Sequence, residues 1–338
     1  MELSYLWFGI VGFLFIGYFV LDGFDFGVGM SLPFVSRNDE ERRVAINTIG
    51  PVWDLNETWL IVAGASLFAA FPLWYASLFS GFYLALLLIL ISLILRGVSF
   101  EYRHQGKGER WTGMFDTFIM IGSAVPALLW GVAFANIIHG VPLDQNGNFT
   151  GTLFSLLNPY SLLGGIVTLT LFFIHGLTYL SLKAEGPVRE RANVLAFRAG
   201  LVAIPVGAAW LVWTVLEHAQ ADHLVVIVSA AAATAVALIS AVVLVKLQKE
   251  GMSFAAMAST IALAVITILS AMFPNVMLST TDPAFSLTIE NASSSTYTLT
   301  VMTWVAVVSL PVVLAYQAWT FWIFRKRVSL ATVSAAAH

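Results

Sequence analysis

The chain is dominated by apolar stretches of about 20 residues, each long enough to cross a lipid bilayer as a helix. Of the 338 residues, 59% are hydrophobic and only 10% are charged, whereas soluble domains carry about 25% charged residues. Because lipid cannot satisfy the hydrogen bonds of open strand edges, we predict an all-α membrane protein with a single transmembrane domain over residues 1–338. The stretches number about nine and cover approximately residues 7–35, 47–71, 75–100, 113–137, 160–182, 194–217, 222–246, 254–278 and 298–324.

Lysine and arginine residues are confined to alternate connections between these stretches. All 16 of them lie after an odd-numbered stretch or at the adjoining helix end, as Arg103 and Lys183 do. The even-numbered connections, such as 140–158 and 279–297, contain no lysine or arginine. Cytoplasmic loops of membrane proteins carry an excess of basic residues. We therefore predict that the N-terminus lies outside and the C-terminus lies in the cytoplasm.

Charge and cysteine content exclude several classes of function. The net charge is -3 and the basic residues form only short groups, so we expect no nucleic-acid partner. The chain has no cysteine, which excludes disulfides, Fe–S clusters and thiolate metal sites.

Histidine is the usual axial ligand of haem b. Of the six histidines, only His175 lies well inside an apolar stretch, and a two-histidine site needs a second ligand at matching depth. We expect His175 to form a hydrogen bond in helix packing, and we expect no metal site on this chain.

The stretch Gly50-Pro-Val-Trp-Asp-Leu-Asn-Glu-Thr-Trp59 places Asp54 and Glu57 inside sequence that is otherwise typical of a lipid-spanning helix. A charge near the middle of a bilayer costs roughly 2.5–3.5 kcal/mol on insertion scales. These two acids therefore need partners, protons or water. The first stretch adds Asp22 and Asp25, and the third adds Arg96.

Helix geometry brings these groups together. At a rise of 1.5 Å per residue, Asp25, Asp54 and Arg96 each lie roughly 10–15 Å from the cytoplasmic ends of their helices. Four acids then accompany one clear cation, so we expect at least one acid to be protonated, hydrated or paired with another chain. One interpretation is a salt bridge that only holds helices together. The other is a hydrated proton entrance, which Pro51 favours because it loosens the first turns of the second helix.

Three glycines in the first stretch, Gly23, Gly27 and Gly29, would let another helix approach closely. These glycines, Asp25 and Asp54 would otherwise meet hydrocarbon. We therefore predict that this face of the first three helices packs against a second subunit.

Several rare polar motifs follow one another along the chain, most densely over residues 20–105. They are Asp22-Gly-Phe-Asp-Phe-Gly27, Gly50-Pro-Val-Trp-Asp-Leu-Asn-Glu-Thr-Trp-Leu60, Phe79-Ser-Gly-Phe-Tyr83, Leu95-Arg-Gly-Val-Ser-Phe-Glu-Tyr-Arg103 and Val301-Met-Thr-Trp-Val-Ala-Val307. In this order and spacing the chain resembles subunit II of the cytochrome bd-type quinol oxidases, including the cyanide-insensitive branch.

The resemblance implies a fold and a set of partners. It implies two four-helix bundles plus one extra helix, paired with a subunit I of similar design in the bacterial cytoplasmic (inner) membrane. Two haems b and one haem d would be held mainly by subunit I. Quinol would supply electrons that reduce oxygen to water, with protons drawn from the cytoplasm. A bound quinone occurs in some members, and small single-helix subunits are further candidate partners.

The resemblance also suggests roles for the polar residues. Asp54 would lie at the proton entrance, and Asp25 and Arg96 stand at matching family positions. We include Glu57 and Asp22 in the expected proton pathway. Arg96 and Trp53 are the candidates for a charge partner or a contact with a haem propionate.

The chain departs from the common family motif Trp-Asp-Gly-Asn at one position, because Leu55 replaces the glycine. A leucine prevents the close backbone approach that glycine allows. Two alternative functions stay open on the sequence alone. One is a proton-coupled secondary transporter that uses Asp25, Asp54 and Arg96, and the other is a purely structural scaffold subunit.

Overall fold

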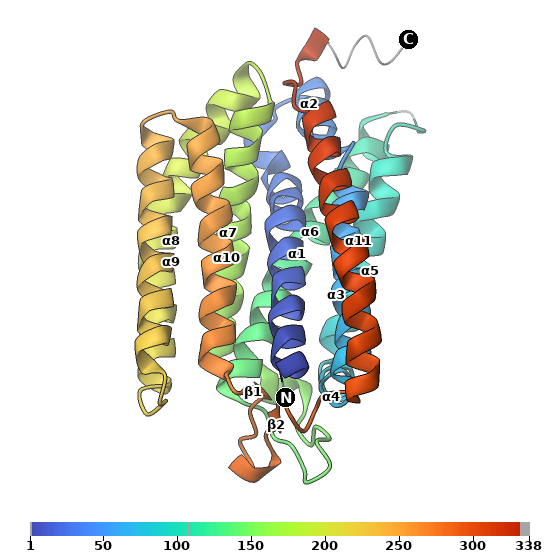
Figure 1. Cartoon of the computed structure of the whole chain (residues 1–338). Coiled ribbons are helices and arrows are strands. Elements are labelled where there is room, and N and C mark those ends of the chain that lie inside the picture. The colour runs from blue at the N-terminus through green and yellow to red at the C-terminus, as the bar shows by residue number, and fades with distance from the viewer. Residues whose placement is uncertain (1, 107, 332–338) are drawn as a thin grey trace.

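The computed structural model describes residues 2–106 and 108–331 and is almost entirely helical (Figure 1). Two short 3₁₀ helices, η1 (Leu153–Leu156) and η2 (Pro283–Phe285), and a two-stranded antiparallel sheet of β1 (Asn275–Met277) and β2 (Leu287–Thr288) lie in the connections. The α-helices are α1 (Glu2–Val35), α2 (Asp39–Ile49), α3 (Trp53–Ala70), α4 (Pro72–Gly81), α5 (Tyr83–Tyr102), α6 (Glu109–His139), α7 (Pro159–Lys183), α8 (Pro187–Glu217), α9 (Leu224–Lys246), α10 (Glu250–Met272) and α11 (Thr296–Ile323).

The long helices form two groups of four with one helix outside them. Helices α1, α3, α5 and α6 pack together, and α7, α8, α9 and α10 form the second group. Helix α1 also packs along α7, which joins the two groups, and α11 packs against the outer side of α1 and α3 (Figure 1). The predicted architecture of two bundles plus one extra helix is therefore confirmed.

Eight of the described helices are long and apolar enough to cross a membrane. Helix α3, the ninth, has 18 residues but carries Asp54 and Glu57 in its first turns, so it falls short on hydropathy. The start of α1 and the end of α11 lie on opposite sides of the structure (Figure 1), as an odd number of crossings requires.

Three predicted stretches have wrong boundaries. The stretch 254–278 ends too late, because α10 stops at Met272 and β1 follows it. The stretch 47–71 is divided between the end of α2 and α3, because the helix breaks at Gly50–Val52 around Pro51. The polar helix α2 was not predicted; it begins at Asp39 and is capped by Asn38, whose side chain accepts a hydrogen bond from the Glu41 amide. The stretch 75–100 is divided at Phe82 into α4 and α5.

Helices α1 and α7 meet at two glycines. A Cβ on Gly27 would lie 1.9 Å from the Phe172 carbonyl oxygen, and a Cβ on Gly176 would lie 2.2 Å from the Gly27 carbonyl carbon. Gly23 faces Phe172 and Gly29 faces Ser123 of α6 in the same way. The prediction that these glycines meet a second subunit was therefore wrong, because their partners are helices of the same chain.

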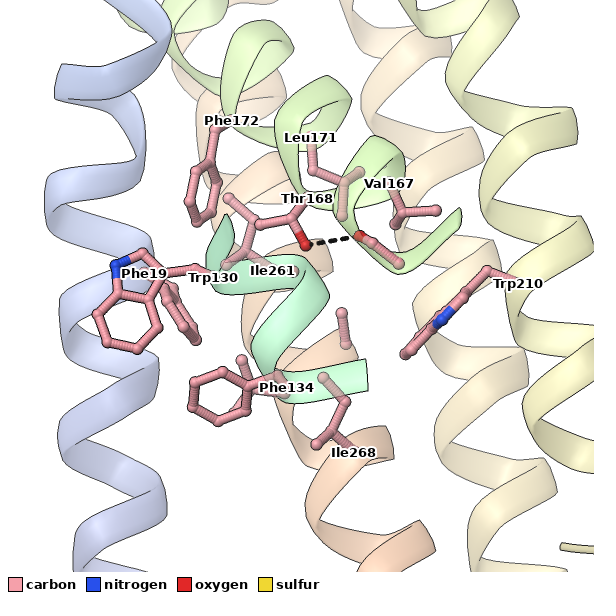
Figure 2. A pocket seen from close by; sticks show the side chains of 14 residues that line it. Phe19, Trp130, Phe134, Val167, Thr168, Leu171, Phe172, Trp210, Ile261 and Ile268 are labelled. Atoms are coloured by element: carbon pink, nitrogen blue, oxygen red, sulfur yellow. Dashed lines mark hydrogen bonds between the residues drawn. The ribbon is translucent and has the colours of Figure 1, made fainter. Parts of the chain in front are cut away.

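The region between the two helix groups is apolar. A small cavity of about 40 Å³ lies there, bounded by α1, α6, α7, α8 and α10. Figure 2 shows aromatic side chains at its border, with Phe19, Trp130 and Phe172 on one side and Trp210 on the other. The Thr168 hydroxyl donates to the Gly164 carbonyl. The residues that line this cavity include no ionisable side chain. The acids inside the membrane-spanning helices therefore lie elsewhere.

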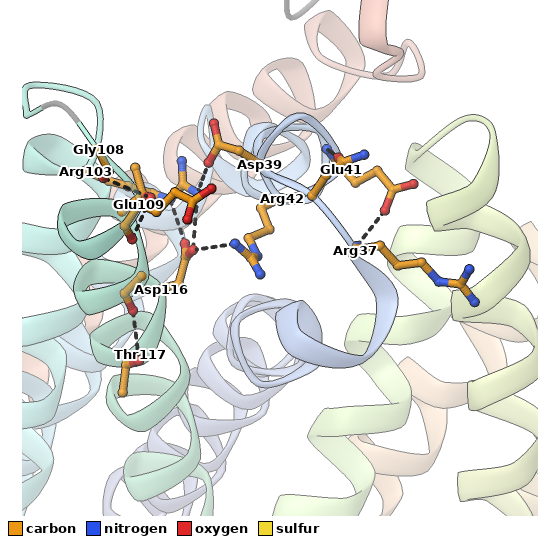
Figure 3. A network of polar contacts seen from close by, with 12 residues as sticks. Arg37, Asp39, Glu41, Arg42, Arg103, Gly108, Glu109, Asp116 and Thr117 are labelled. Carbon is orange, nitrogen blue, oxygen red and sulfur yellow. Dashed lines mark hydrogen bonds and ion pairs between the residues drawn. The ribbon is translucent and has the colours of Figure 1, made fainter.

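At one end of the molecule, arginines of the basic connections form ion pairs with acids of neighbouring helices. Arg103, which directly follows α5, bonds Asp39 of α2 and Asp116 of α6, each at 2.6 Å, and Arg42 joins Asp116 at 3.5 Å (Figure 3). Arg191 of α8 reaches Glu41.

Glu41 lies in the same network, on α2. Burial alone would raise the pKa of Glu41, but hydrogen bonds from the Arg191 guanidinium and the Arg37 amide outweigh burial and hold that pKa below its usual value. Basic residues of the connections that we predicted to be cytoplasmic therefore lie together around α2. The orientation of the chain in a membrane stays a prediction.

We expect Gly27→Ala to destabilise the protein, because the added methyl group meets backbone atoms of α7 that cannot move independently. Overpacking of this kind costs about 1–3 kcal/mol or more, so the melting temperature of the purified complex should fall by several degrees. Gly9→Ala is the matched control on the same helix, since no atom lies within 4 Å of its added Cβ. Equal melting temperatures for the two variants would contradict the close contact.

Candidate functional site

A buried ion pair lies where α1, α3 and α5 meet. Arg96 of α5 donates through Nη2 to Asp22 Oδ1 at 2.7 Å and to Glu57 Oε2 at 3.2 Å. The side chains of Arg96 and Asp22 are fully buried, and that of Glu57 is 24% exposed. The guanidinium also lies 4.3 Å from the centre of the Phe26 ring. Charges this far from water persist only when paired and hydrogen-bonded, so Arg96 fixes the positions of both acids.

Asp25 lies at the depth of Arg96 in the sequence-based prediction, but its hydrogen-bond partner is Asn56. Its Oδ2 accepts a hydrogen bond from Asn56 Nδ2 at 2.8 Å, and no direct bond joins it to Arg96. Asn56 Nδ2 also lies 3.3 Å from the Leu21 carbonyl oxygen. Asn56 is fully buried, and both hydrogen bonds of its NH₂ group go to α1.

Asp54 lies outside this buried cluster. The residue is exposed on the surface of the chain, one turn before Glu57 on α3. Its backbone carbonyl accepts a hydrogen bond from Thr58 Oγ1 at 2.9 Å. Trp53 beside it is half-buried, with its ring 5.1 Å from that of Phe100. The structure therefore brings Asp22, Glu57 and Arg96 together. Asp54 stays apart from them, exposed in the first turn of α3.

Several buried polar atoms of the cluster have no partner among the described residues. They are Asp22 Oδ2, Asp25 Oδ1, Arg96 Nε and Arg96 Nη1. Buried polar groups are almost always hydrogen-bonded, to protein or to ordered water. Three acids also accompany one guanidinium here. The cluster therefore has hydrogen-bonding capacity for water and for protons beyond the contacts that hold it together.

Gln317 of α11 is a member of this site that sequence reasoning missed. Its Nε2 donates to Asn56 Oδ1 at 3.0 Å, and its Oε1 accepts from Trp59 Nε1 at 3.4 Å. It is buried, unlike most of α11. The signal was present, because Gln317 is the only side-chain amide between residues 298 and 324.

Leu55 stands where the family motif has glycine, and it lines an apolar groove between α1, α3 and α11. This groove has a volume of about 460 Å³ and also contacts Trp59, Gln317 and Val305. Leu55 is half-buried. The substitution therefore changes the wall of the groove, on the side of α3 that faces α11.

His175 has the packing role that the sequence predicted. Its Nε2 donates to the Val20 carbonyl oxygen at 3.0 Å, and its ring stacks on Phe254 at 4.7 Å. Residues 2–106 and 108–331 contain no group of three or more side chains that could hold a metal ion.

The family model for cytochrome bd terminal oxidase subunit II matches residues 3–324. The chain belongs to this family. Cytochrome bd ubiquinol oxidase subunit 2 of Bacillus subtilis is 39% identical over 329 residues, which cover 96% of each chain. Cytochrome bd-I ubiquinol oxidase subunit 2 of Escherichia coli K12 is also 39% identical, over 99% of this chain and 98% of that protein.

The fold of a solved relative agrees with this assignment. A chain of the bd oxidase from Geobacillus thermodenitrificans superposes with a TM-score of 0.78, covering 96% of this chain and 99% of that one at 15% identity. The chain is therefore a multi-pass membrane subunit of a haem-containing terminal quinol oxidase, a quinol:oxygen oxidoreductase, and its partner is subunit I. The transporter alternative is set aside.

We expect Arg96→Met to lower the stability of the oxidase strongly. Removing one partner of a buried ion pair costs about 3–5 kcal/mol, because the remaining charge is left uncompensated. The double change Arg96→Met with Asp22→Asn should recover much of that loss. Arg110→Met, at an exposed arginine, is the control. The melting temperature of the purified complex should be lowest for Arg96→Met, higher for the double variant and highest for Arg110→Met. A single Arg96→Met variant as stable as Arg110→Met would contradict this expectation.

Proposed function

We propose that this subunit supplies the proton entrance of the oxidase and that acidic side chains of α3 and α1 form it. The supporting observation is the increase in burial from the acids at the start of α3 to the acids of α1. Asp54 is exposed, Glu57 one turn later is partly buried, and Asp22 and Asp25 beyond it are fully buried. Residues three apart on a helix have Cβ atoms about 5–6 Å apart, so Asp54 and Glu57 are neighbours.

Each group has a distinct part in this pathway. Asp54 takes a proton from water at the surface and Glu57 receives it, since carboxylates gain and lose protons readily. Arg96 stays protonated at all relevant pH values and serves as a fixed charge that holds Glu57 and Asp22 in place. Water on the unpartnered oxygens of Asp22 and Asp25 links the buried acids. Asp22 and Asp25, both fully buried on α1, are the innermost acceptors on this chain.

We assign the haems, two of b type and one of d type, mainly to subunit I. Within residues 2–106 and 108–331, the one histidine deep inside a helix does not fit a haem, because His175 is fully buried against Val20 and Phe254 and its Nε2 is already hydrogen-bonded. Arg96 is enclosed by two acids, which suits the charge-partner role. Trp53, half-buried near the surface, is then the candidate for contact with a haem propionate.

We assign the exposed face of α3 to the contact with subunit I. Asp54, Thr58, Ile61, Ala65 and Phe68 are all exposed and follow one stripe of the helix. Three of them, Thr58, Ile61 and Ala65, also line the groove between α3 and α11. A carboxylate at the head of an apolar stripe is costly against lipid. A partner subunit over this stripe removes that cost and places Asp54 at the border between the two subunits.

The remaining assignments follow the family. We place the complex in the bacterial cytoplasmic membrane, with the basic end around α2 in the cytoplasm, electrons taken from quinol and oxygen as the acceptor. The apolar groove beside Leu55 offers space for the bound quinone. Helix α11, which exposes most of its length, offers a surface for a small single-helix subunit.

Two substitutions of Asp54 test the proton entrance. Asp54→Asn keeps the size of the side chain but cannot exchange a proton, so quinol oxidase turnover should fall about tenfold or more. Asp54→Glu keeps the carboxyl group and should retain a measurable part of turnover. Both complexes are first matched for haem content by absorption spectroscopy. Wild-type turnover in a fully assembled Asp54→Asn oxidase would leave only the structural scaffold role for this stretch.

A further inference from the structure

A chain of side-chain amides connects the outer helix α11 to the buried acid Asp25. Trp59 Nε1 donates to Gln317 Oε1 at 3.4 Å, Gln317 Nε2 donates to Asn56 Oδ1 at 3.0 Å, and Asn56 Nδ2 donates to Asp25 Oδ2 at 2.8 Å. Asn56 is fully buried, Asp25 is fully buried, and Trp59 and Gln317 are 6% exposed. Water therefore cannot easily substitute for any member.

The donor at the outer end sets the direction of this chain. An indole nitrogen can only donate a hydrogen bond, whereas an amide side chain can donate or accept. Trp59 therefore holds the oxygen of Gln317 toward itself and turns the Gln317 NH₂ group toward Asn56. That contact in turn fixes the Asn56 oxygen, so Asn56 presents its NH₂ group to Asp25. The Asn56 NH₂ group also lies 3.3 Å from the Leu21 carbonyl oxygen, so without the Gln317 contact only α1 would hold the orientation of Asn56.

We infer that Gln317 and Trp59 are positioning residues that fix which protonation state of Asp25 the site favours. The inference rests on the proposed proton entrance for its role in turnover. An NH₂ group facing Asp25 stabilises the ionised carboxylate, and an oxygen facing it stabilises the protonated acid. Groups near Asp25 that also affect its charge are Asp22 on α1, Glu57 on α3, Arg96 on α5 and Tyr179 on α7. None of these groups belongs to the amide chain.

The test titrates Asp25 by infrared spectroscopy in the intact purified oxidase. The band that disappears in Asp25→Asn identifies its carboxyl group. In Gln317→Met and in Trp59→Phe, the pH at which this band titrates should move upward by at most roughly one unit, because Asn56 is held less firmly and its hydrogen bond to the Asp25 carboxylate weakens. The acid limb of turnover against pH should move in the same direction.

Thr303→Val is the matched control on α11. Thr303 Oγ1 accepts from Trp7 Nε1 at 3.0 Å and thus also ties α11 to α1, but it does not belong to the amide chain. Its titration should match wild type. An unchanged titration in Gln317→Met and Trp59→Phe, or an equal shift in Thr303→Val, would overturn the inference.

The two hypotheses can fail separately. If Asp25→Asn turns over at the wild-type rate, the proton pathway through Asp25 is wrong, yet the infrared titration still decides whether Gln317 positions Asp25. If Asp25→Asn is inactive and the titration does not move in the Gln317 and Trp59 variants, only the positioning role is wrong.

Discussion

The ion pair between Arg96 and Asp22 is the contact on which the rest of the site depends. Arg96 is fully buried in a membrane subunit and bonds acids from two helices, α1 and α3. A charge of this kind is tolerated only with partners in fixed geometry. The pair therefore locks α5 against α1 and α3, and it sets where Glu57 and Asp22 can lie.

Close helix packing supports this arrangement from the opposite side of α1. Gly27 and Gly176 bring α1 and α7 into backbone contact, so α1 cannot shift without separating the two helix groups. One face of α1 thus carries glycines against α7, while Asp22 and Asp25 contact α5 and α3. The same helix holds the fold together and carries the buried acids, which explains why its central residues are buried on all sides.

The sequence predicted those features that depend on local composition. The length of the apolar stretches predicted the membrane-spanning helices. The alternation of basic connections predicted that these connections share one end of the molecule, and the ion pairs of Arg103 and Arg191 with α2 confirm that they cluster there. Features that depend on tertiary partners could not be predicted in this way. The glycines of α1 indicated close approach but not which helix approaches.

Gln317 shows the same limit. Its sequence marks it as unusual, yet its partner Asn56 is 261 residues away. Asp54, Asp25 and Arg96 were expected at one depth, but depth alone does not determine which acid Arg96 contacts. Arg96 pairs with the neighbouring acids Asp22 and Glu57 instead. Family membership assigns the reaction, and only the geometry distinguishes the acids from one another.

The central claim is that protons reach the oxidase interior through the acids of this subunit. Proton uptake from the medium during a single reaction of the reduced enzyme with oxygen, followed with a pH-sensitive dye, tests this claim directly. The account predicts that Glu57→Gln, which removes the acid between the exposed Asp54 and the buried Asp25, slows uptake about tenfold or more at unchanged haem content. Uptake at the wild-type rate in the Glu57→Gln oxidase would contradict it.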